Sequence, residues 1–232
     1  MIDLEDIEFR WRPDDPPVLR IPELTVAAGE KIFLQGPSGS GKTSLLSLLG
    51  GIVLPQKGQV RILDQNLSDL SAAGRDQFRA DHMGIIFQVF NLVPYLSLID
   101  NVTLPCFFSR QRHTRACGGQ GTVDDIARAL LEALDVSAGQ MADKPVSELS
   151  TGQQQRVAVA RALIGNPELV IADEPTSALD DSNTNLFLDL LFEEVSRRKS
   201  TLVFVSHDSR LATRFDRSLA ISDLSLPRGG QN

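Results

Sequence analysis

A glycine-rich stretch near the start of the chain carries the clearest chemical signal. Residues 36–43 fit the phosphate-loop pattern G-x-x-x-x-G-K-[ST] and follow a short apolar run. Glycines let the backbone curl so that successive amides point at phosphate oxygens. We expect Lys42 to reach the β- and γ-phosphates of ATP, and the Thr43 hydroxyl to ligate Mg²⁺. The alternative is a glycine-rich turn that only connects a strand to a helix. The predicted Mg-ATP contacts are Gly36, Pro37, Ser38, Gly39, Ser40, Gly41, Lys42 and Thr43.

Two carboxylates form a second chemical signal in the last third of the chain. Residues 169–172 are all apolar and predict a central strand, whose C-terminal end delivers Asp173 and Glu174 to the ligand edge of a sheet. Asp173 is placed to hold Mg²⁺ through water, and Glu174 to orient or deprotonate an attacking water. Such a pair would also fit a helix N-cap, but a phosphate loop in the same chain favours the catalytic interpretation.

The elements that must position these residues follow from the apolar runs. Short strands over residues 2–11 and 18–26 form an antiparallel N-terminal part. Helices then alternate with apolar strands, which predicts a mainly parallel sheet with flanking helices. The predicted fold class is therefore α/β, a P-loop NTPase core. The remaining predicted strands are 31–35, 58–63, 84–88, 169–172 and 201–205, and the predicted helices are 43–49, 124–134, 153–164 and 185–197.

The character of the chain changes between residues 91 and about 142. We interpret this part as a helical sub-domain inserted into a single nucleotide-binding domain of residues 1–232, whose core is formed by residues 1–90 and 143–232. The basic residues 110–115 are expected to form a solvated loop, with attraction to anionic lipid headgroups as the lesser alternative.

Composition limits the classes of function. The 232 residues are 42% hydrophobic and 23% charged, with a net charge of −7, which argues against broad nucleic-acid binding. Cys106 and Cys117 are expected to be free thiols rather than a disulfide. The N-terminus has no signal-peptide pattern, and the longest uncharged stretch, residues 84–99, is too short to span a bilayer. A membrane function would therefore need a separate membrane subunit.

The sequence Leu149-Ser150-Thr151-Gly152-Gln153 resembles the signature motif L-S-G-G-Q of ATP-binding-cassette (ABC) ATPases. Three further motifs of that family stand in order around it. Gln88 matches the glutamine loop, residues 177–180 match the loop after the catalytic carboxylates, and His207 matches the switch histidine. The matches cover nearly the whole chain.

The resemblance implies a homodimer. Ser150 and Gly152 open a helix and so offer a second anion-binding N-terminus, which one molecule cannot wrap around its own nucleotide. In the family, each signature closes on the ATP of the other subunit. The implied contacts to that ATP are Ser150, Gly152, Gln153 and Asp180. An ordinary serine-capped helix is the alternative, and it is expected to explain Ser150 but neither Gly152 nor Gln153.

Three further roles are implied by the resemblance. His207 would contact the γ-phosphate, although a lone histidine at a strand end is often structural. Gln88 would sense Mg²⁺ and water and transmit to a membrane subunit, unless it is a plain strand terminus. Trp11 stands where the family carries an aromatic residue that stacks on adenine; strand packing beside Phe9 is its competing role.

Two positions depart from the family pattern. Thr151 replaces the first signature glycine, and a β-branched residue does not readily adopt a positive φ. Either the backbone at Thr151 therefore keeps to the ordinary region of φ and ψ, or the closure of the signature on ATP is slightly altered. Asp100 stands where many relatives have glutamate, which is a small change.

Residues 88–102 resemble the family branch that includes lipoprotein-release, macrolide-efflux and cell-division ATPases. The implied function is an ATP-binding and ATP-hydrolysing subunit, peripheral at the cytoplasmic face of the inner membrane, that drives a separate permease through ATP-dependent dimer closure. A soluble, non-transport ABC ATPase is the alternative; a kinase or GTPase would lack the signature. The predicted permease groove comprises Phe90, Leu92, Pro94, Tyr95 and Leu96, with a core loop as the alternative.

Overall fold

The computed structural model describes residues 1–37, 39–118, 121–137, 144–177 and 179–224. Ser38 of the predicted phosphate loop lies outside them, as does residue 178. The chain forms two compact units: Met1–Arg79 together with the segment from Thr201 onward, and Ala80–Ser200. The predicted helical sub-domain, residues 91 to about 142, falls inside the second unit in sequence, and its limits stay a prediction.

The first unit contains an antiparallel sheet, as predicted. Its strands have the order β2-β1-β4-β5. A register shift between Glu5 and Glu8, with Asp6 at φ 51°, lets both Leu4 and Ile7 face the core although they are three residues apart. The strands are β1 (Ile2–Phe9), β2 (Leu19–Val26), β4 (Lys57–Ile62) and β5 (Gln65–Asn66).

The same unit contains three parallel strands. Strand β3 (Lys31–Gln35) pairs with β8 (Thr201–Ser206) on one side and with β9 (Arg217–Ala220) on the other. Phe33 and Phe204 are fully buried and stack with centroids 6.2 Å apart. Strands buried on both faces read as continuous apolar runs, which is why β3 and β8 were predictable. The unit's helices include α1 (Lys42–Leu49) and α9 (Ile221–Leu224), with 3₁₀ turns at Leu67–Asp69 and Ser209–Arg214.

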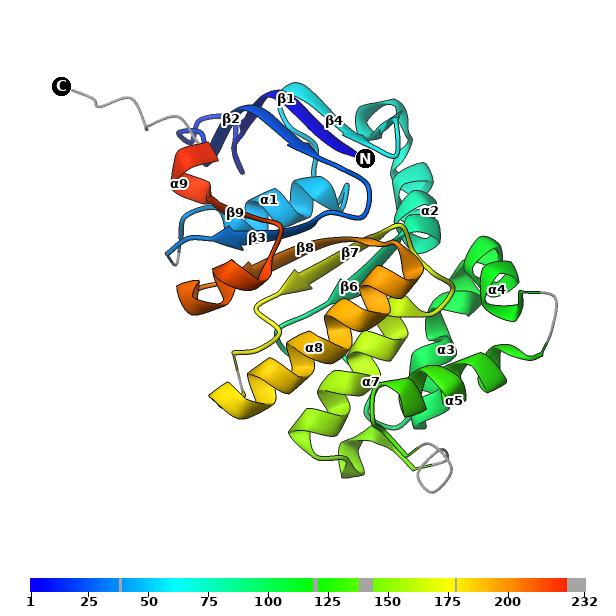
Figure 1. Ribbon diagram of the computed structural model, residues 1–232. Helices are drawn as coiled ribbons and strands as arrows, with labels where there is room; N and C mark the ends of the chain where they lie inside the picture. The colour runs from blue at the N-terminus through cyan, green and yellow to red at the C-terminus, as the bar shows by residue number, and fades with distance from the viewer. Residues whose placement is uncertain (38, 119–120, 138–143, 178, 225–232) are drawn as a thin grey trace. The chain divides into compact units, whose positions relative to one another are not determined.

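The second unit contains the parallel pair β6 (Met83–Ile86) and β7 (Leu169–Asp173). Its central helix is α7 (Thr151–Leu163), which packs against β6, α3, α5 and α8 (Figure 1). The other helices are α3 (Leu98–Phe108), α4 (Arg110–Cys117), α5 (Val123–Ala133) and α8 (Asp181–Arg198), with a 3₁₀ turn at Val146–Glu148. Helix α2 (Ala72–His82) connects the two units in sequence.

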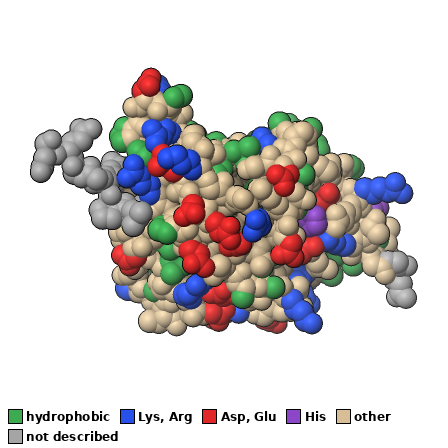
Figure 2. Space-filling view, turned by 90° about the horizontal axis from the view of Figure 1, so that it is seen from above, with side chains coloured by type: hydrophobic (Ala, Val, Ile, Leu, Met, Phe, Trp, Pro, Cys, Tyr) green, Lys and Arg blue, Asp and Glu red, His purple; other side chains and the backbone are tan. Residues whose placement is uncertain are grey.

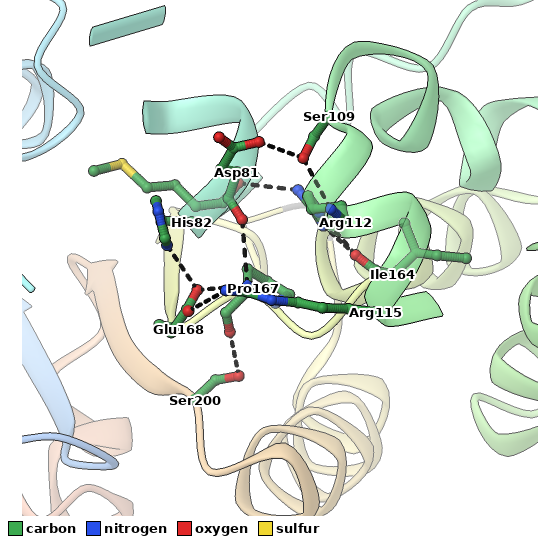
Figure 3. A network of polar contacts seen from close by, with 10 residues as sticks. Asp81, His82, Ser109, Arg112, Arg115, Ile164, Pro167, Glu168 and Ser200 are labelled. Atoms are coloured by element: carbon green, nitrogen blue, oxygen red, sulfur yellow. Dashed lines mark hydrogen bonds and ion pairs between the residues drawn. The ribbon is translucent and has the colours of Figure 1, made fainter. Parts of the chain in front are cut away.

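The prediction of a solvated loop at residues 110–115 is wrong. These residues form most of α4, capped by Ser109, and Arg112 is only 2% exposed. Its guanidinium donates to the carbonyl oxygens of Met83 at 3.1 Å and Ala162 at 2.6 Å. It also donates to the carbonyl oxygen of Ile164 at 2.8 Å (Figure 3). Burial lowers the pKa of Arg112 to about 10. The residue is therefore a buried cation that satisfies three carbonyl groups, one at the start of β6 and two at the end of α7.

A neighbouring cluster completes this attachment of α4. Arg115 donates two hydrogen bonds to the Glu168 carboxylate, at 2.9 and 2.6 Å, and His82 Nδ1 lies 3.1 Å from the same group (Figure 3). Ser109 donates to the Asp81 carboxylate. Charge-assisted bonds of this kind link α4 to the start of β7 and the end of α2.

Cys106 and Cys117 are both free, as predicted. Figure 2 shows Asp and Glu side chains lying among Lys and Arg side chains on the face that it draws. Among the residues that the structure describes, none of the helices combines the length and apolar character that crossing a membrane requires.

Candidate nucleotide site

The phosphate loop lies between β3 and α1. Gly39 and Gly41 have φ of 78° and 103°, in the left-handed region that favours glycine. Gly41 is the N-cap of α1 and has no side chain with which to cap the amides of the first turn. The start of α1 therefore offers amide donors and the positive end of the helix dipole to an anion.

Two side chains of the loop are arranged for a ligand. Lys42 Nζ donates to the carbonyl oxygens of Gly36 at 2.7 Å and Pro37 at 3.1 Å, which places the ammonium over the loop. The Ser40 hydroxyl is buried and has no hydrogen-bond partner among the described residues. A buried hydroxyl without a partner is costly, and a phosphate oxygen would satisfy it. The loop therefore fits a nucleotide phosphate chain.

Trp11 lies beside this loop. It follows the end of β1, and its Nε1 donates to the Ser44 hydroxyl of α1 at 3.2 Å. Its ring meets Phe9 edge to face, with centroids 5.1 Å apart, yet the residue is 56% exposed. Strand packing thus accounts for one edge of the ring and leaves much of its surface open. Stacking on adenine stays a prediction.

His207 leaves the same sheet edge as the phosphate loop. Ser206, the last residue of β8, lies opposite Gln35, the last residue of β3, in parallel register. His207 is exposed, and Asp208 beyond it caps the next 3₁₀ turn and pairs with Arg210 at 2.8 Å. The hydrogen bond from Arg210 lowers the pKa of Asp208. The backbone is therefore held on both sides of His207, by the strand pairing of Ser206 before it and by the cap that Asp208 forms after it.

In the second unit, Gln88 and the two carboxylates share one sheet edge. Ile86 ends β6 opposite Ala172, one residue before Asp173 ends β7. Strand β6 therefore stops two residues short of Gln88, earlier than predicted, and Gln88 is exposed in the loop that follows. Glu174 has φ 45°, a conformation that non-glycine residues rarely adopt. Such outliers concentrate at functional sites.

The signature residues begin α7. Ser150 is the N-cap; its hydroxyl accepts from the Gln153 amide at 3.3 Å, and Gln153 Oε1 accepts from the Ser150 amide at 3.0 Å. This is a capping box. The expectation that a helix cap would leave Gln153 unexplained is therefore wrong, because the box uses both side chains. Thr151 is the first helical residue and does not have a positive φ. The signature loop therefore keeps an ordinary backbone conformation at this position.

Gly152 is the signature residue that the cap does not explain. A Cβ built on it meets no heavy atom within 4 Å among the described residues. The helix start faces a cleft of about 490 Å³ that also includes Asp180, the N-cap of α8. Hydrogen bonds from the Asn183 amide and the Ser182 hydroxyl lower the pKa of Asp180. The lining residues are Ser150, Thr151, Gly152, Gln153, Gln155, Arg156, Leu179, Asp180, Asn183 and Phe187.

A second groove, of about 290 Å³, runs beside residues 89–94. Tyr95 is 79% exposed, so the alternative of a buried core loop is wrong for this position; the neighbouring Val89 is 78% exposed. Of the predicted groove residues, Phe90, Leu92 and Pro94 line it, whereas Tyr95 and Leu96 do not. The lining residues are Val89, Phe90, Asn91, Leu92, Pro94, Val146, Ser147 and Gln154.

Two residues of α7 that sequence reasoning missed contact functional segments. Gln155, only 2% exposed, donates to the Pro175 carbonyl oxygen beside Glu174 at 2.7 Å. Arg161 donates to the carbonyl oxygens of Phe90 and Asn91. The available signal was periodicity: Gln155 is a polar residue on a helix face that carries Val159 and Ala162, and such a residue needs an internal partner.

A phosphate loop between a parallel strand and an uncapped helix defines a P-loop nucleotide-binding protein. The protein-family model described as "ABC transporter" matches residues 19–177. The chain belongs to this family, and it is an ABC-type ATPase.

Curated relatives and solved structures agree with this assignment. The chain is 40% identical to the ABC transporter ATP-binding protein YbbA of Escherichia coli K12, over 86% of this chain and 83% of that protein. It is 38% identical to the lipoprotein-releasing system ATP-binding protein LolD of Syntrophotalea carbinolica, over 89% and 87% of the two chains. It also resembles the dimeric ATP-binding cassette MJ0796 bound to ADP and Pi, with a TM-score of 0.81, 32% identity and coverage of 98% and 97%. The predicted α/β P-loop fold is thereby confirmed.

Proposed function

We propose that the chain is the ATP-hydrolysing subunit of a transporter of the LolD and MacB type, and that it drives a separate inner-membrane permease from the cytoplasmic face. The observation that carries this proposal is the occurrence of an uncapped phosphate-loop helix and an open signature helix in one cassette. The likeness to LolD over most of both chains supports the transport role. The chain is also 38% identical to the macrolide export ATP-binding/permease protein MacB of Rhodopirellula baltica, over 93% of this chain but 31% of that protein.

The phosphate chain of ATP would be bound by the backbone amides of residues 36–43, except for Pro37, which has no N–H, and by Lys42. The Ser40 hydroxyl, which has no partner within the part of the chain that the structure describes, supports this assignment. Thr43, Gln88 and Asp173 would hold Mg²⁺, since hydroxyl, amide and carboxylate oxygens are the ligands that this ion prefers. When bound, Mg²⁺ would neutralise charge on the phosphate oxygens.

Hydrolysis would rest on Glu174 and His207. A carboxylate at the end of a central strand is suited to accept a proton from the attacking water and to direct a lone pair of the water oxygen toward the γ-phosphorus. The left-handed backbone of Glu174 sets the direction of its side chain and supports a functional role. His207 would donate a hydrogen bond to a γ-phosphate oxygen, in keeping with its position one residue after β8.

The active unit would be a head-to-tail homodimer that closes on ATP. Ser150, Gly152, Gln153 and Asp180 would contact the nucleotide held by the second copy. The open space around Gly152 and the cleft beside it leave room for that nucleotide. The structural relatives named MJ0796 are described as dimeric cassettes, which supports this assembly.

The permease would contact the groove beside residues 90–96. Most residues that line this groove are apolar; the exposed Val89 is one of them, and the exposed Tyr95 follows the lining residue Pro94. An amphipathic helix of the partner is the element that fits such a groove, because its apolar face buries against apolar walls while its other face stays in water.

Affinity purification of the full chain from detergent-solubilised membranes of its own host tests the transport role. We expect an integral membrane protein to co-purify, and Gln154→Glu with Phe90→Asp in the groove to abolish the capture. A matched variant, Gln111→Glu on the exposed face of α4, should leave the capture unchanged. Recovery of only soluble partners, with ATPase activity intact, would favour a non-transport ABC ATPase instead.

A further inference from the structure

Arg161 connects the signature helix to the segment that follows Gln88. One guanidinium nitrogen donates to the Asn91 carbonyl oxygen and the other to the Phe90 carbonyl oxygen, each at 2.6 Å. A planar guanidinium presents two parallel donors, so it can satisfy two successive carbonyl groups at once, whereas lysine cannot. Burial lowers the pKa of Arg161, but an arginine stays protonated at neutral pH.

The backbone that receives these two bonds is strained. Phe90 has φ 29° and Asn91 has φ 50°, so two successive residues other than glycine lie in the left-handed region. Such conformations persist only where the surroundings impose them. The Asn91 amide also donates back to the Val89 carbonyl oxygen, which tightens the turn. Arg161 therefore supplies a charged donor to both carbonyls of this turn.

The same helix forms part of the groove. Gln154 lines it together with Phe90 and Asn91, and Gln154 and Arg161 lie seven residues apart, which places them on one face of α7. Helix α7 begins at the signature cap Ser150. A single helix of 13 residues therefore carries the signature at its start, a groove wall one turn later and the contact to the turn after Gln88 near its end.

We propose that Arg161 is a positioning residue that couples the signature helix to the glutamine loop. When α7 shifts or rotates, the two hydrogen bonds from Arg161 move the Phe90 and Asn91 carbonyls with the helix. The shape of the groove therefore changes together with the position of the signature residues. The loop also contains Gln88, so the same contact sets the position of that side chain. This inference rests on the proposed function, since the ligands of the signature and the groove belong to it.

The contact is distinct from a general stabilising ion pair. Both acceptors are backbone carbonyls of one turn, and among the residues that the structure describes the Arg161 guanidinium donates hydrogen bonds to that turn alone. Arg197, on α8 of the same unit, pairs instead with the Glu194 carboxylate at 2.6 Å and is 58% exposed. Arg197→Met is therefore a matched control that removes an arginine from a helix without touching the turn.

Hydrogen–deuterium exchange of the full chain tests the positioning role without requiring a permease. In Arg161→Met, we expect peptides that span residues 87–96 to exchange about tenfold faster, because two charge-assisted hydrogen bonds are lost. Peptides from α8 and β7 should stay within about twofold of the parental rates, as should all peptides of Arg197→Met. Unchanged exchange at residues 87–96 would overturn the proposal, and a uniform rise over the second unit would show a merely structural role.

Steady-state ATP hydrolysis supplies the second readout. We expect Arg161→Met to lower kcat about tenfold with KM for ATP within about twofold, because Gln88 is displaced while the phosphate loop is untouched. Arg161→Lys, which retains one of the two bonds, should fall between Arg161→Met and the parental chain. Parental kcat in all variants would overturn the coupling. If the parental chain itself does not hydrolyse ATP, the proposed function fails, whereas the exchange result still decides whether Arg161 holds the turn.

Discussion

Gln155 Nε2 lies 2.7 Å from the Pro175 carbonyl oxygen, which joins the signature helix to the turn that follows Glu174. Gln155 is buried on α7, five residues after the cap Ser150. The Ser177 amide donates to the Glu174 carbonyl oxygen at 3.2 Å, so the turn is also closed from within. The backbone next to Glu174 is therefore held by a contact from the signature helix.

Replacing Gln155 should impair hydrolysis more than nucleotide binding. Gln155→Met keeps the side-chain volume but leaves the Pro175 carbonyl without its donor, which costs about 1–3 kcal/mol in a buried site. We expect kcat to fall about tenfold while KM for ATP stays within about twofold. Gln111→Met, on the exposed face of α4, is the control. Parental kcat in Gln155→Met would show that the contact does not position Glu174.

Glu174→Gln should bind ATP as the parental chain does but turn it over about 10²–10⁴ times more slowly, because an amide cannot accept the proton of the attacking water. With hydrolysis blocked, the ATP-bound dimer should accumulate. Size-exclusion chromatography with light scattering, in the presence of Mg-ATP, distinguishes the dimer from the monomer. An ATPase rate equal to that of the parental chain would show that Glu174 is not the base.

Trp11 provides an internal probe of the nucleotide site, because it is the only tryptophan in the chain. If adenine stacks on its exposed face, ATP should quench Trp11 fluorescence in a saturable way, and Trp11→Ala should raise Kd for ATP about tenfold. Trp11→Phe keeps a ring and should raise it less. Lys42→Ala, which removes the ammonium over the phosphate loop, should abolish the quenching. Saturable ATP binding without any change in fluorescence would exclude stacking.

The departure at Thr151 should be nearly neutral. Because Thr151 is the first helical residue and has an ordinary backbone conformation, glycine gains nothing there sterically and adds freedom to the unfolded chain. We expect Thr151→Gly to lower the free energy of unfolding by about 0.5–1 kcal/mol and to leave ATP turnover within about twofold. A large change in turnover or in its cooperativity would mean that the Thr151 side chain contacts the nucleotide of the second copy.

Sequence patterns predicted the parts of this molecule that obey local rules. Strands β3, β7 and β8 are uninterrupted apolar runs, and the glycines of residues 36–43 need the left-handed conformations that the structure shows at Gly39 and Gly41. The order and spacing of the family's motifs then located the remaining site residues along the chain. The uncapped start of α1 and the Ser40 hydroxyl, which lacks a partner among the residues described, add physical support that no pattern provides.

Contacts between polar groups distant in sequence were not predictable. Arg112 reads as a solvated cation, but it is buried because Met83, Ala162 and Ile164 present carbonyl groups to it from 29 to 52 residues away. Arg161 likewise looks like a surface residue in the sequence, because its two acceptors are 70 and 71 residues away and leave no local signal. Helical periodicity reports which face is apolar, but it does not report which backbone groups need a donor.

The hydrogen-bonded cluster around Glu168 should make the free energy of unfolding depend on pH in the acid range. Burial alone would raise the pKa of Glu168, but hydrogen bonds from His82 and Arg115 outweigh it and lower the pKa to about 2. The folded-state pKa is thus below the unfolded value near 4.5. Its contribution to stability is therefore present above pH of about 4.5 and is lost as the pH falls toward 2.

Urea denaturation of the parental chain and of Glu168→Gln tests this dependence. The glutamine keeps the shape but cannot carry the charge that His82 and Arg115 stabilise, so it should lower the free energy of unfolding at pH 7. The difference between the two chains should shrink as the pH is lowered from about 5 toward 3, because the parental glutamate gives up its advantage on protonation. Asp135→Asn, which removes an exposed partner of Arg156 at the end of α5, is the control and should show a much smaller difference. A difference that stays constant over this pH range would mean that the carboxylate charge does not stabilise the attachment of α4.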